Sequence, residues 1–316
     1  MSGATDAPFR RQATKFGAPA VVSEMVASQS LLDQRPDVVR RMCRHEGAGL
    51  WIVQLAARRP EDMRFGASLL ADAGVDLIDI NMGCPTKQVT GGQSGSALMR
   101  DLDLASRIID AALEGAGGRP VTLKMRLGWD HDSLNAPELA RRAEEQGVVM
   151  ITVHGRTRAM FYKGTADWGA IAETVKATAR PVIANGDIGC VTTAKAALEA
   201  SGAHGVMVGR AAMGQPWRVG MVAAGLAGEA FAVPSLHQQC ESLCEQIDDS
   251  AELYGERLGV RTVRKHVSAA IDGAMLDLTP AARRKARADL CQIDKPAVLI
   301  SALRRLYASH AEVLAA

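Results

Sequence analysis

The stretch Ile78–Lys87, IDINMGCPTK, combines an apolar strand with a polar corner. The apolar run ends in the polar residue Asn81, and Gly83, Cys84 and Pro85 then form a tight corner. A structural cysteine normally lies inside an apolar run, where it packs as a small hydrophobe. Cys84 instead follows the run, at the point where a chain usually emerges at the surface. The stretch therefore predicts a buried strand whose end carries a chemically available thiol.

Similar short runs recur between residues 20 and 210, and helical patterns separate them. Near-continuous Val/Ile/Leu runs of this length are typical of parallel strands that are buried on both faces. Charged residues lie on one side of the intervening segments, such as Pro60–Ala73, Leu102–Leu113 and Pro137–Gln146. The predicted strands are Ala20–Ser23, Trp51–Leu55, Leu77–Asn81, Val121–Arg126, Met150–His154, Val182–Asn185 and Gly205–Gly209.

This alternation is compatible with either a doubly wound sheet or a (β/α)₈ TIM barrel. A doubly wound sheet would carry a Gly-rich fingerprint after its first strand, and no GxGxxG follows any of the runs. Each run ends in a polar residue or glycine, as expected where barrel strands converge on an active site. We predict the barrel, although seven runs are found where eight are needed.

The strand pattern stops after the segment Phe231–Pro234. The segments Ser235–Tyr254, Arg257–Ile271, Pro280–Cys291 and Pro296–Ala308 predict four helices, and Thr279-Pro280 is a typical helix start. We therefore divide the chain into a catalytic barrel domain, residues 1–233, and an all-helical domain, residues 234–316.

The composition limits the class of protein. The chain has 316 residues, of which 47% are hydrophobic, but no run of about 18 apolar residues that could span a membrane. Its six cysteines lack the spacing of a disulfide framework, which favours the reducing cytoplasm. From Arg257 onward eleven Lys/Arg face five Asp/Glu, although the whole chain carries only +2. This local excess makes a polyanion a candidate partner.

Polar residues at the predicted strand ends suggest a ligand with one phosphate. Glycines let backbone N–H groups approach an anion, and an arginine can bind it in a bidentate way. Lys124 lies within an apolar run and needs a partner, either Asp79 or an electron-rich cofactor ring. A flat ligand with one phosphate fits flavin mononucleotide (FMN) better than a dinucleotide. The residues considered are Gln54, Lys124, His154, Asn185, Gly186, Asp187, Gly209 and Arg210.

Two further clusters have an ordinary structural interpretation as well. His237, Cys240 and Cys244 have helical spacing but lack a plausible fourth zinc ligand, so we interpret them as helix packing and expect no structural metal. Basic residues crowd two helical segments of the tail, and a solvated helix face is the commoner explanation of such runs. The net charge of the tail favours a polyanion-binding surface here; it comprises Arg261, Arg264, Lys265, His266 and Arg284.

The chain resembles the tRNA-dihydrouridine synthases, and the bacterial B-type subfamily in particular. The resemblance covers essentially the whole chain in long, ordered motifs, including VRTVRKHV (Val260–Val267) in the tail. The other motifs are MSGATDAPF (Met1–Phe9), VSEM (Val22–Met25), VQL (Val53–Leu55), DINMGCPTKQV (Asp79–Val89), GSAL (Gly95–Leu98), VTLKMRLGW (Val121–Trp129), VHGRTR (Val153–Arg158), IANGDI (Ile183–Ile188) and GRAAMGQPW (Gly209–Trp217).

The resemblance implies an FMN-dependent oxidoreductase, with NADPH as electron donor, that reduces a tRNA uridine to 5,6-dihydrouridine. It places Met1 along the flavin, Gln54, Lys124 and His154 at the ring, and Asn185, Asp187, Gly209 and Arg210 at the ribityl phosphate. Cys84 becomes the general acid. For the B type the implied target is the D-loop uridine at position seventeen. We expect a monomeric, cytoplasmic tRNA-processing flavoprotein.

This chemistry explains a thiol outside the strand. Hydride delivered to C6 of uracil must be matched by a proton delivered to C5, and thiols with an ordinary pKa near 8.5 are mostly protonated at neutral pH. Gly91, Gly92 and Gly95 predict a mobile lid over an extruded base. Lys87, Arg156 and Arg158 lie at the same strand ends, where they can contact tRNA phosphates or remain ordinary surface charges.

Two rival functions remain open, and so does the reason why a strand is missing. One rival is a reductase of free pyrimidines, such as a dihydroorotate dehydrogenase, which the basic tail disfavours. The other is an RNA-binding barrel without turnover, which Cys84, Lys124 and His154 disfavour. The family's first motif usually follows a strand that ends in Ala-Pro. The expected reasons for its absence are a misassigned start, a shortened sequence or a barrel that closes by other means.

Overall fold

The computed structural model describes residues 3–33, 35–45, 47 and 49–311. The chain forms two compact units. The barrel unit comprises Ala20–Arg44 and Gly49–Gly209, and the helical unit comprises Met1–Pro19, His45–Ala48 and Arg210–Ala316. The predicted domain boundary after residue 233 falls inside the helical unit, so that boundary stays a prediction.

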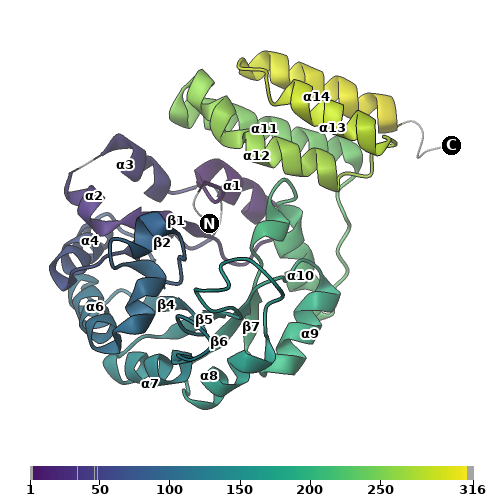
Figure 1. The fold of residues 1–316 in the computed structure, drawn as a ribbon. Coiled ribbons are helices and arrows are strands. Elements are labelled where there is room, and N and C mark those ends of the chain that lie inside the picture. Colours follow the sequence, from purple (N-terminus) through teal and green to yellow (C-terminus); the bar gives the residue numbers. More distant parts are fainter. Residues whose placement is uncertain (1–2, 34, 46, 48, 312–316) are drawn as a thin grey trace. The chain divides into compact units, whose positions relative to one another are not determined.

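The barrel unit contains one parallel sheet of seven strands in sequential order, which curls as in a TIM barrel (Figure 1). This confirms the predicted fold class and its seven strands; β1 and β7 form the two edges. The first strand extends beyond the predicted Ala20–Ser23, because pairing with β2 resumes at Met25 after a bulge. The strands are β1 (Val22–Ala27), β2 (Ile52–Ala56), β3 (Leu77–Met82), β4 (Val121–Arg126), β5 (Met150–His154), β6 (Val182–Asn185) and β7 (Gly205–Met207).

Helices surround the outside of this curled sheet (Figure 1). Their start signals are local: proline occupies the first turn of α3, α4 and α7, and the side chain of Asp101 caps α6. The helices of the barrel unit are α2 (Ser28–Leu32), α3 (Pro36–Met42), α4 (Pro60–Asp72), α5 (Lys87–Thr90), η1 (Gly95–Arg100), α6 (Leu102–Gly115), α7 (Ala136–Gln146), η2 (Gly169–Ile171), α8 (Ala172–Lys176) and α9 (Val191–Ser201).

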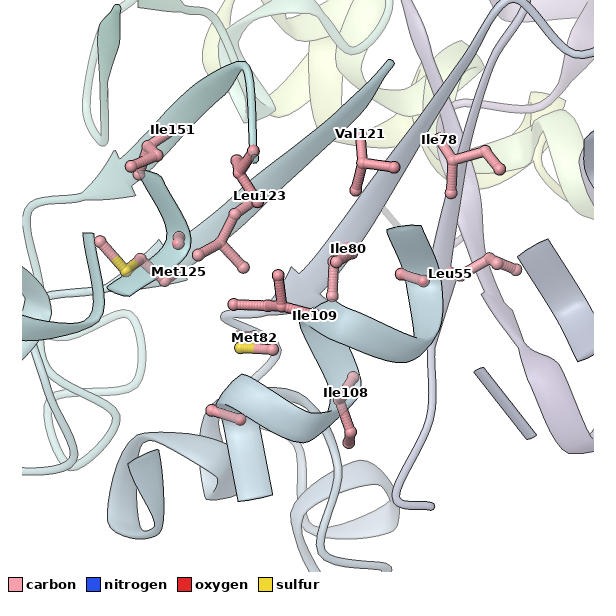
Figure 2. Close-up of a cluster of buried hydrophobic side chains, with 14 of the residues drawn as sticks. Leu55, Ile78, Ile80, Met82, Ile108, Ile109, Val121, Leu123, Met125 and Ile151 are labelled. Atoms are coloured by element: carbon pink, nitrogen blue, oxygen red, sulfur yellow. The ribbon is translucent and has the colours of Figure 1, made fainter. Parts of the chain in front are cut away.

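The hydrophobic core lies between the sheet and these outer helices. Figure 2 shows side chains of β3 and β4 packed with Ile108 and Ile109 of α6. Because successive side chains of a strand alternate between faces, Ile78, Ile80 and Met82 share the outer face of β3. The residues between them belong to the opposite face, which lines the barrel interior.

The helical unit joins an N-terminal helix to the end of the chain. Its core includes Leu243, Ile247 and Val263, and α1 binds α11 through the ion pairs Arg11–Asp249 and Lys15–Glu245. The four predicted tail helices are confirmed within a few residues, and no described helix is long and apolar enough to cross a membrane. The elements are α1 (Ala7–Lys15), η3 (Arg210–Ala212), α10 (Trp217–Ala227), α11 (Leu236–Tyr254), α12 (Glu256–Gly273), α13 (Pro280–Leu290) and α14 (Pro296–Ala311).

Candidate active site

Polar side chains of β2, β3 and β4 form a hydrogen-bonded chain in the barrel interior. Gln54 Nε2 donates to Asp79 Oδ2 at 2.6 Å, and Thr122 Oγ1 donates to Asp79 Oδ1 at 2.7 Å. Burial raises the pKa of Asp79, and these two hydrogen bonds oppose that rise. Both oxygens of Asp79 therefore accept hydrogen bonds from uncharged side chains, one on β2 and one on β4.

Lys124 faces the same interior but hydrogen-bonds to a different strand. Its ammonium donates to Asn185 Oδ1 at 3.0 Å, while Asn185 Nδ2 donates to the Met207 carbonyl at 2.8 Å. Burial lowers the pKa of Lys124 to about 8, although the charge of Asp79 opposes this shift. Of the two partners expected for Lys124, Asp79 therefore acts through its field rather than by direct contact. The ammonium remains a half-buried cation at neutral pH.

Asn81 shapes the corner that carries Cys84. Its Oδ1 accepts hydrogen bonds from the backbone N–H of Gly83 at 3.1 Å and of Cys84 at 2.9 Å. Its Nδ2 donates to Gln54 Oε1 at 2.7 Å, which connects the corner to Asp79. A polar residue ends the buried strand because its side chain replaces the lost strand pairing for two backbone donors.

The carbonyl side of the corner is held equally firmly. The Cys84 carbonyl accepts from Ser96 Oγ at 2.8 Å and from the Ser96 backbone at 3.1 Å. Arg126 Nε donates to the Gly83 carbonyl at 2.8 Å. Gly95 has φ of +60°, and a Cβ there would lie 2.8 Å from the Cys84 carbonyl oxygen. Glycine is thus required at position 95 for close packing, in addition to any freedom it gives a lid.

The Cys84 thiol itself is half-buried. Its Sγ lies 3.4 Å from Thr86 Oγ1, and α5 begins one residue later with the exposed Lys87. The backbone of the corner is therefore fixed by at least five hydrogen bonds, whereas its side chain has one weak polar neighbour. This arrangement presents a thiol at a defined place without burying it in the core.

The end of β5 faces the end of β6. His154 is the register partner of Asn185, and Gly186 follows with φ of +116°. A Cβ on Gly186 would lie 2.9 Å from His154 Cδ2, so the glycine makes room for the imidazole ring. Asp187 has φ of +54°, and its carboxylate forms an ion pair of 2.5 Å with Arg156. Arg156 is only 1% exposed, so it lies inside the protein rather than on its rim.

The remaining predicted ligand residues are distributed between the units. Gly209 ends the barrel unit, and the exposed Arg210 begins η3 of the helical unit. Met1 lies outside the described residues. Arg158 is half-buried, and its guanidinium stacks on the Trp129 ring with 4.6 Å to the centroid. The barrel interior therefore brings together Gln54, Lys124, His154 and Asn185 on neighbouring strands.

The basic residues of the tail differ in exposure. Arg261 and Arg284 are exposed and Lys265 is half-buried, whereas Arg264 pairs with Asp294 at 2.5 Å. His266 is only 2% exposed, and its ring lies 5.0 Å from that of Phe9. Burial lowers the pKa of His266 to about 3, which keeps the ring neutral at pH 7. His266 therefore contributes no charge to the surface of α12.

Cys240 and Cys244 lie in the apolar core of the helical unit. Glu241 comes close to both thiols, but its carboxylate binds Arg304 at 2.7 and 2.8 Å. His237, the third member of the predicted trio, is exposed. The contacts of both cysteines agree with helix packing.

Sequence reasoning assigned no role to three residues that shape the site: Asn81, Ser96 and Arg126. Burial lowers the pKa of Arg126 to about 10, and its guanidinium joins two loops by donating to the carbonyls of Gly83, Thr157 and Phe161. The available signal was weak. A polar residue at the end of a strand, or an arginine two positions after a lysine, indicates a role in the site only when it is known which face of the strand lines the barrel interior.

The curled parallel sheet, with a half-buried lysine and a thiol toward its strand ends, places the chain in the class of (β/α) barrel proteins. Among solved structures, 6-hydroxypseudooxynicotine amine oxidase from Pseudomonas geniculata N1 shares this fold at a TM-score of 0.53 and 12% identity, covering 78% of this chain and 47% of that one. A family model described as "Dihydrouridine synthase (Dus)" matches residues 1–304. The chain belongs to the dihydrouridine synthase family.

Curated relatives agree with this assignment. A "Probable tRNA-dihydrouridine synthase" from Rhodobacter capsulatus is 47% identical over 98% of this chain and 94% of its own length. A "tRNA-dihydrouridine synthase B" from Xanthomonas axonopodis pv. citri is 42% identical over 84% of this chain and 80% of its own. The resemblance found in the sequence motifs, including that to the B type, is confirmed.

Proposed function

We propose that this protein reduces a uridine of tRNA to 5,6-dihydrouridine, with FMN as cofactor, NADPH as electron donor and Cys84 as the general acid. The observation that carries the proposal is the Cys84 corner, fixed through Asn81 and Gln54 to the polar interior that holds Lys124. Membership of the dihydrouridine synthase family and the names of the curated relatives support the substrate and the reaction.

The residues of the barrel interior fit a flavin. The half-buried ammonium of Lys124 has a pKa lowered to about 8, so a ligand ring that acquires negative charge would stabilise its charged form. Gln54, Lys124 and His154 would hold the ring system, and Asn185, Gly186, Gly209 and Arg210 the ribityl phosphate, with Met1 along the flavin. The carboxylate of Asp187 would repel a phosphate, so we assign it to Arg156 instead.

The two transfers require groups on different elements. When bound, the reduced flavin supplies hydride to C6 of the uracil ring. The Cys84 thiol donates its proton to C5, and the thiolate that remains lies in the field of two cations, the half-buried Lys124 and the buried Arg126. The corner keeps Cys84 at one place while the short α5 and residues 91–95 form the lid that encloses the base. Proton transfer is thus assigned to Cys84, and enclosure of the base is assigned to α5 and residues 91–95.

We assign tRNA binding to exposed and half-buried cations of both units. Lys87 and Arg158 lie on the loops after β3 and β5, and Arg261, Lys265 and Arg284 lie in the helical tail. Arg156 and His266 are left out of this surface because they are buried, and the ion pair of Arg264 with Asp294 reduces its contribution. In this proposal residues 1–233 form the catalytic domain and residues 234–316 the tRNA-binding domain.

The direct test is a turnover experiment with the purified full-length protein. A flavin absorbance spectrum, followed by formation of dihydrouridine in unmodified tRNA with NADPH under anaerobic conditions, is the expected result. Free uridine and orotate serve as competing substrates. Turnover of either instead of tRNA would favour a pyrimidine reductase, and a protein without flavin that still binds tRNA would favour the RNA-binding alternative. Mass mapping of the product would show whether position seventeen is the target.

A further inference from the structure

Every N–H group of the Arg156 guanidinium has a hydrogen-bond acceptor. A guanidinium carries five N–H donors and no acceptor. Nε donates to the Lys163 carbonyl at 3.1 Å, and Nη2 donates to the Gly164 carbonyl at 2.7 Å and to Asp187 Oδ2 at 2.5 Å. Nη1 donates to Asp187 Oδ1 at 3.1 Å, and its second N–H lies 3.2 Å from His154 Nε2. The imidazole nitrogen is the fifth acceptor.

This count fixes the chemical form of His154. Because a guanidinium nitrogen can only donate, His154 Nε2 must offer its lone pair. A proton on Nε2 would place two N–H groups against each other and leave a buried guanidinium donor without an acceptor, which costs about 1–3 kcal/mol or more for a charged group. The ring must then carry its single proton on Nδ1.

The surroundings of the ring favour the same form. Arg126 is its register partner on β4, and Lys124 lies two residues before Arg126, so two cations on the neighbouring strand oppose a positive imidazole. The only carboxylate in this set, Asp187 after β6, already receives two N–H groups from Arg156. Gly186 lies against Cδ2 and Nε2 of the ring, where a Cβ would collide, which fixes the ring's place.

We propose that Arg156 is a positioning residue that holds His154 as a neutral imidazole with its proton on Nδ1. His154 thereby becomes a donor through Nδ1 alone and does not add a third cation beside Lys124. The value of this for catalysis rests on the proposed function, in which His154 contacts the flavin ring. The tautomer itself follows from the hydrogen-bond count and holds without any ligand.

The test is nuclear magnetic resonance of the purified protein labelled with ¹⁵N-histidine. His154 is assigned from the signals that disappear in His154→Gln. At pH 7 we expect a protonated, pyrrole-type Nδ1 and an unprotonated, pyridine-type Nε2, with no protonation at the ordinary histidine pKa of about 6.5. A wild-type spectrum with a proton on Nε2, or a charged ring at pH 7, would overturn the proposal.

The variant Arg156→Met sharpens the assignment to Arg156. Removal of the guanidinium takes away the donor to His154 Nε2 and the cation beside Asp187, whose carboxylate still accepts from the Ala166 backbone N–H. We therefore expect a mixture of tautomers and protonation near or above pH 6.5. Arg158→Met is the matched control. Arg158 lies two residues from Arg156 and stacks on Trp129, so its replacement should leave the His154 signals unchanged. An unchanged tautomer and midpoint in Arg156→Met would refute the role of Arg156.

Failure of this inference is distinguishable from failure of the proposed function. A protein that binds no flavin but shows the Nδ1–H tautomer refutes the flavin-dependent reaction and leaves the inference intact. An active flavoprotein whose His154 carries its proton on Nε2 refutes the inference and leaves the flavin-dependent reaction intact. If Arg156→Met does not fold, the wild-type spectrum alone decides between the two tautomers.

Discussion

Ile80 and Asn81 are neighbours on β3 with opposite surroundings. Ile80 is fully buried among apolar side chains on the outer face of the sheet (Figure 2). Asn81 connects Gln54 to the Cys84 corner on the inner face. The same alternation continues on β4, where Leu123 faces α6 and Lys124 faces Asn185. One strand thus supplies stability through one face and, in the proposed function, chemistry through the other, so substitutions on the two faces should affect different measurements.

The largest effect is expected at the end of the inner face. We expect Cys84→Ala to slow reoxidation of the reduced protein by tRNA by about two to four decades, the usual contribution of a positioned general acid. Reduction by NADPH and the unfolding temperature stay unchanged, and Cys84→Ser is nearly as impaired because a hydroxyl is a weaker acid. Rapid-mixing absorbance at the flavin band measures both half-reactions, with Cys43→Ala as control. Reoxidation at the wild-type rate in Cys84→Ala would assign the proton to another group.

On the outer face, Ile80→Ala should act on stability. Truncation of a fully buried isoleucine lowers the free energy of unfolding by about 2–5 kcal/mol, because transfer energy is lost and a cavity remains. Chemical denaturation measures this loss, and Ile80→Val should cost only about 0.5–1.5 kcal/mol. Turnover per folded molecule should stay close to wild type. A large loss of turnover at full stability would break the division between the two faces.

Lys124 gives the inner face a pH signature. Its pKa of about 8 in the folded protein lies below the ordinary value of 10.5, so between these pH values the unfolded chain binds more protons. Stability should therefore rise with pH across this window by at most about 1.4 kcal/mol per pH unit, whereas below pH 8 the full burial penalty is present. Denaturation of wild type and Lys124→Met from pH 7 to 10.5 measures the difference, which isolates Lys124 from other titrating groups. Parallel profiles would contradict the assigned pKa.

Asn81→Ala should loosen the corner. The variant removes the partner of the backbone N–H groups of Gly83 and Cys84 and of the side-chain Oε1 of Gln54. The free energy of unfolding should fall by about 1–3 kcal/mol when such groups stay buried. Amide hydrogen exchange at Gly83 and Cys84 should accelerate, while exchange on the outer helix α6 does not. Asn81→Asp keeps an acceptor for both N–H groups and should restore part of the protection. Equal exchange in Asn81→Ala and wild type would show that the corner is held without Asn81.

The smallest effect on stability is expected from the tail. Reversal of charge at Arg261, Lys265 and Arg284 should leave the unfolding free energy within about 0.5 kcal/mol, as for most surface changes. It should weaken tRNA binding and reduce the slope of log K against log salt by about one unit for each lost phosphate contact. Lys176→Glu, on the exposed helix α8, is the control for charge alone. An unchanged slope in the triple variant would remove these residues from the proposed surface.

The fold was predictable because its signals are local. Seven apolar runs, the proline starts of α4 and α14 and the Ser235 and Thr279 caps act within a few residues of each element. The orientation of Arg156 was not predictable in this way, since its acceptors come from residues 154, 163, 164 and 187. His266 likewise looks like part of a basic run, but its ring lies against that of Phe9 and its Nδ1 accepts from the Gly214 backbone N–H.

Arg126 illustrates how one side chain can connect two loops through their main chain. Its three hydrogen-bond acceptors are all backbone carbonyls, one after β3 and two after β5. Backbone carbonyls are present whatever side chain a residue carries. The three hydrogen bonds therefore link the loop after β3 to the loop after β5 through groups that every residue supplies, so replacement of Arg126 itself is the change that would separate the two loops.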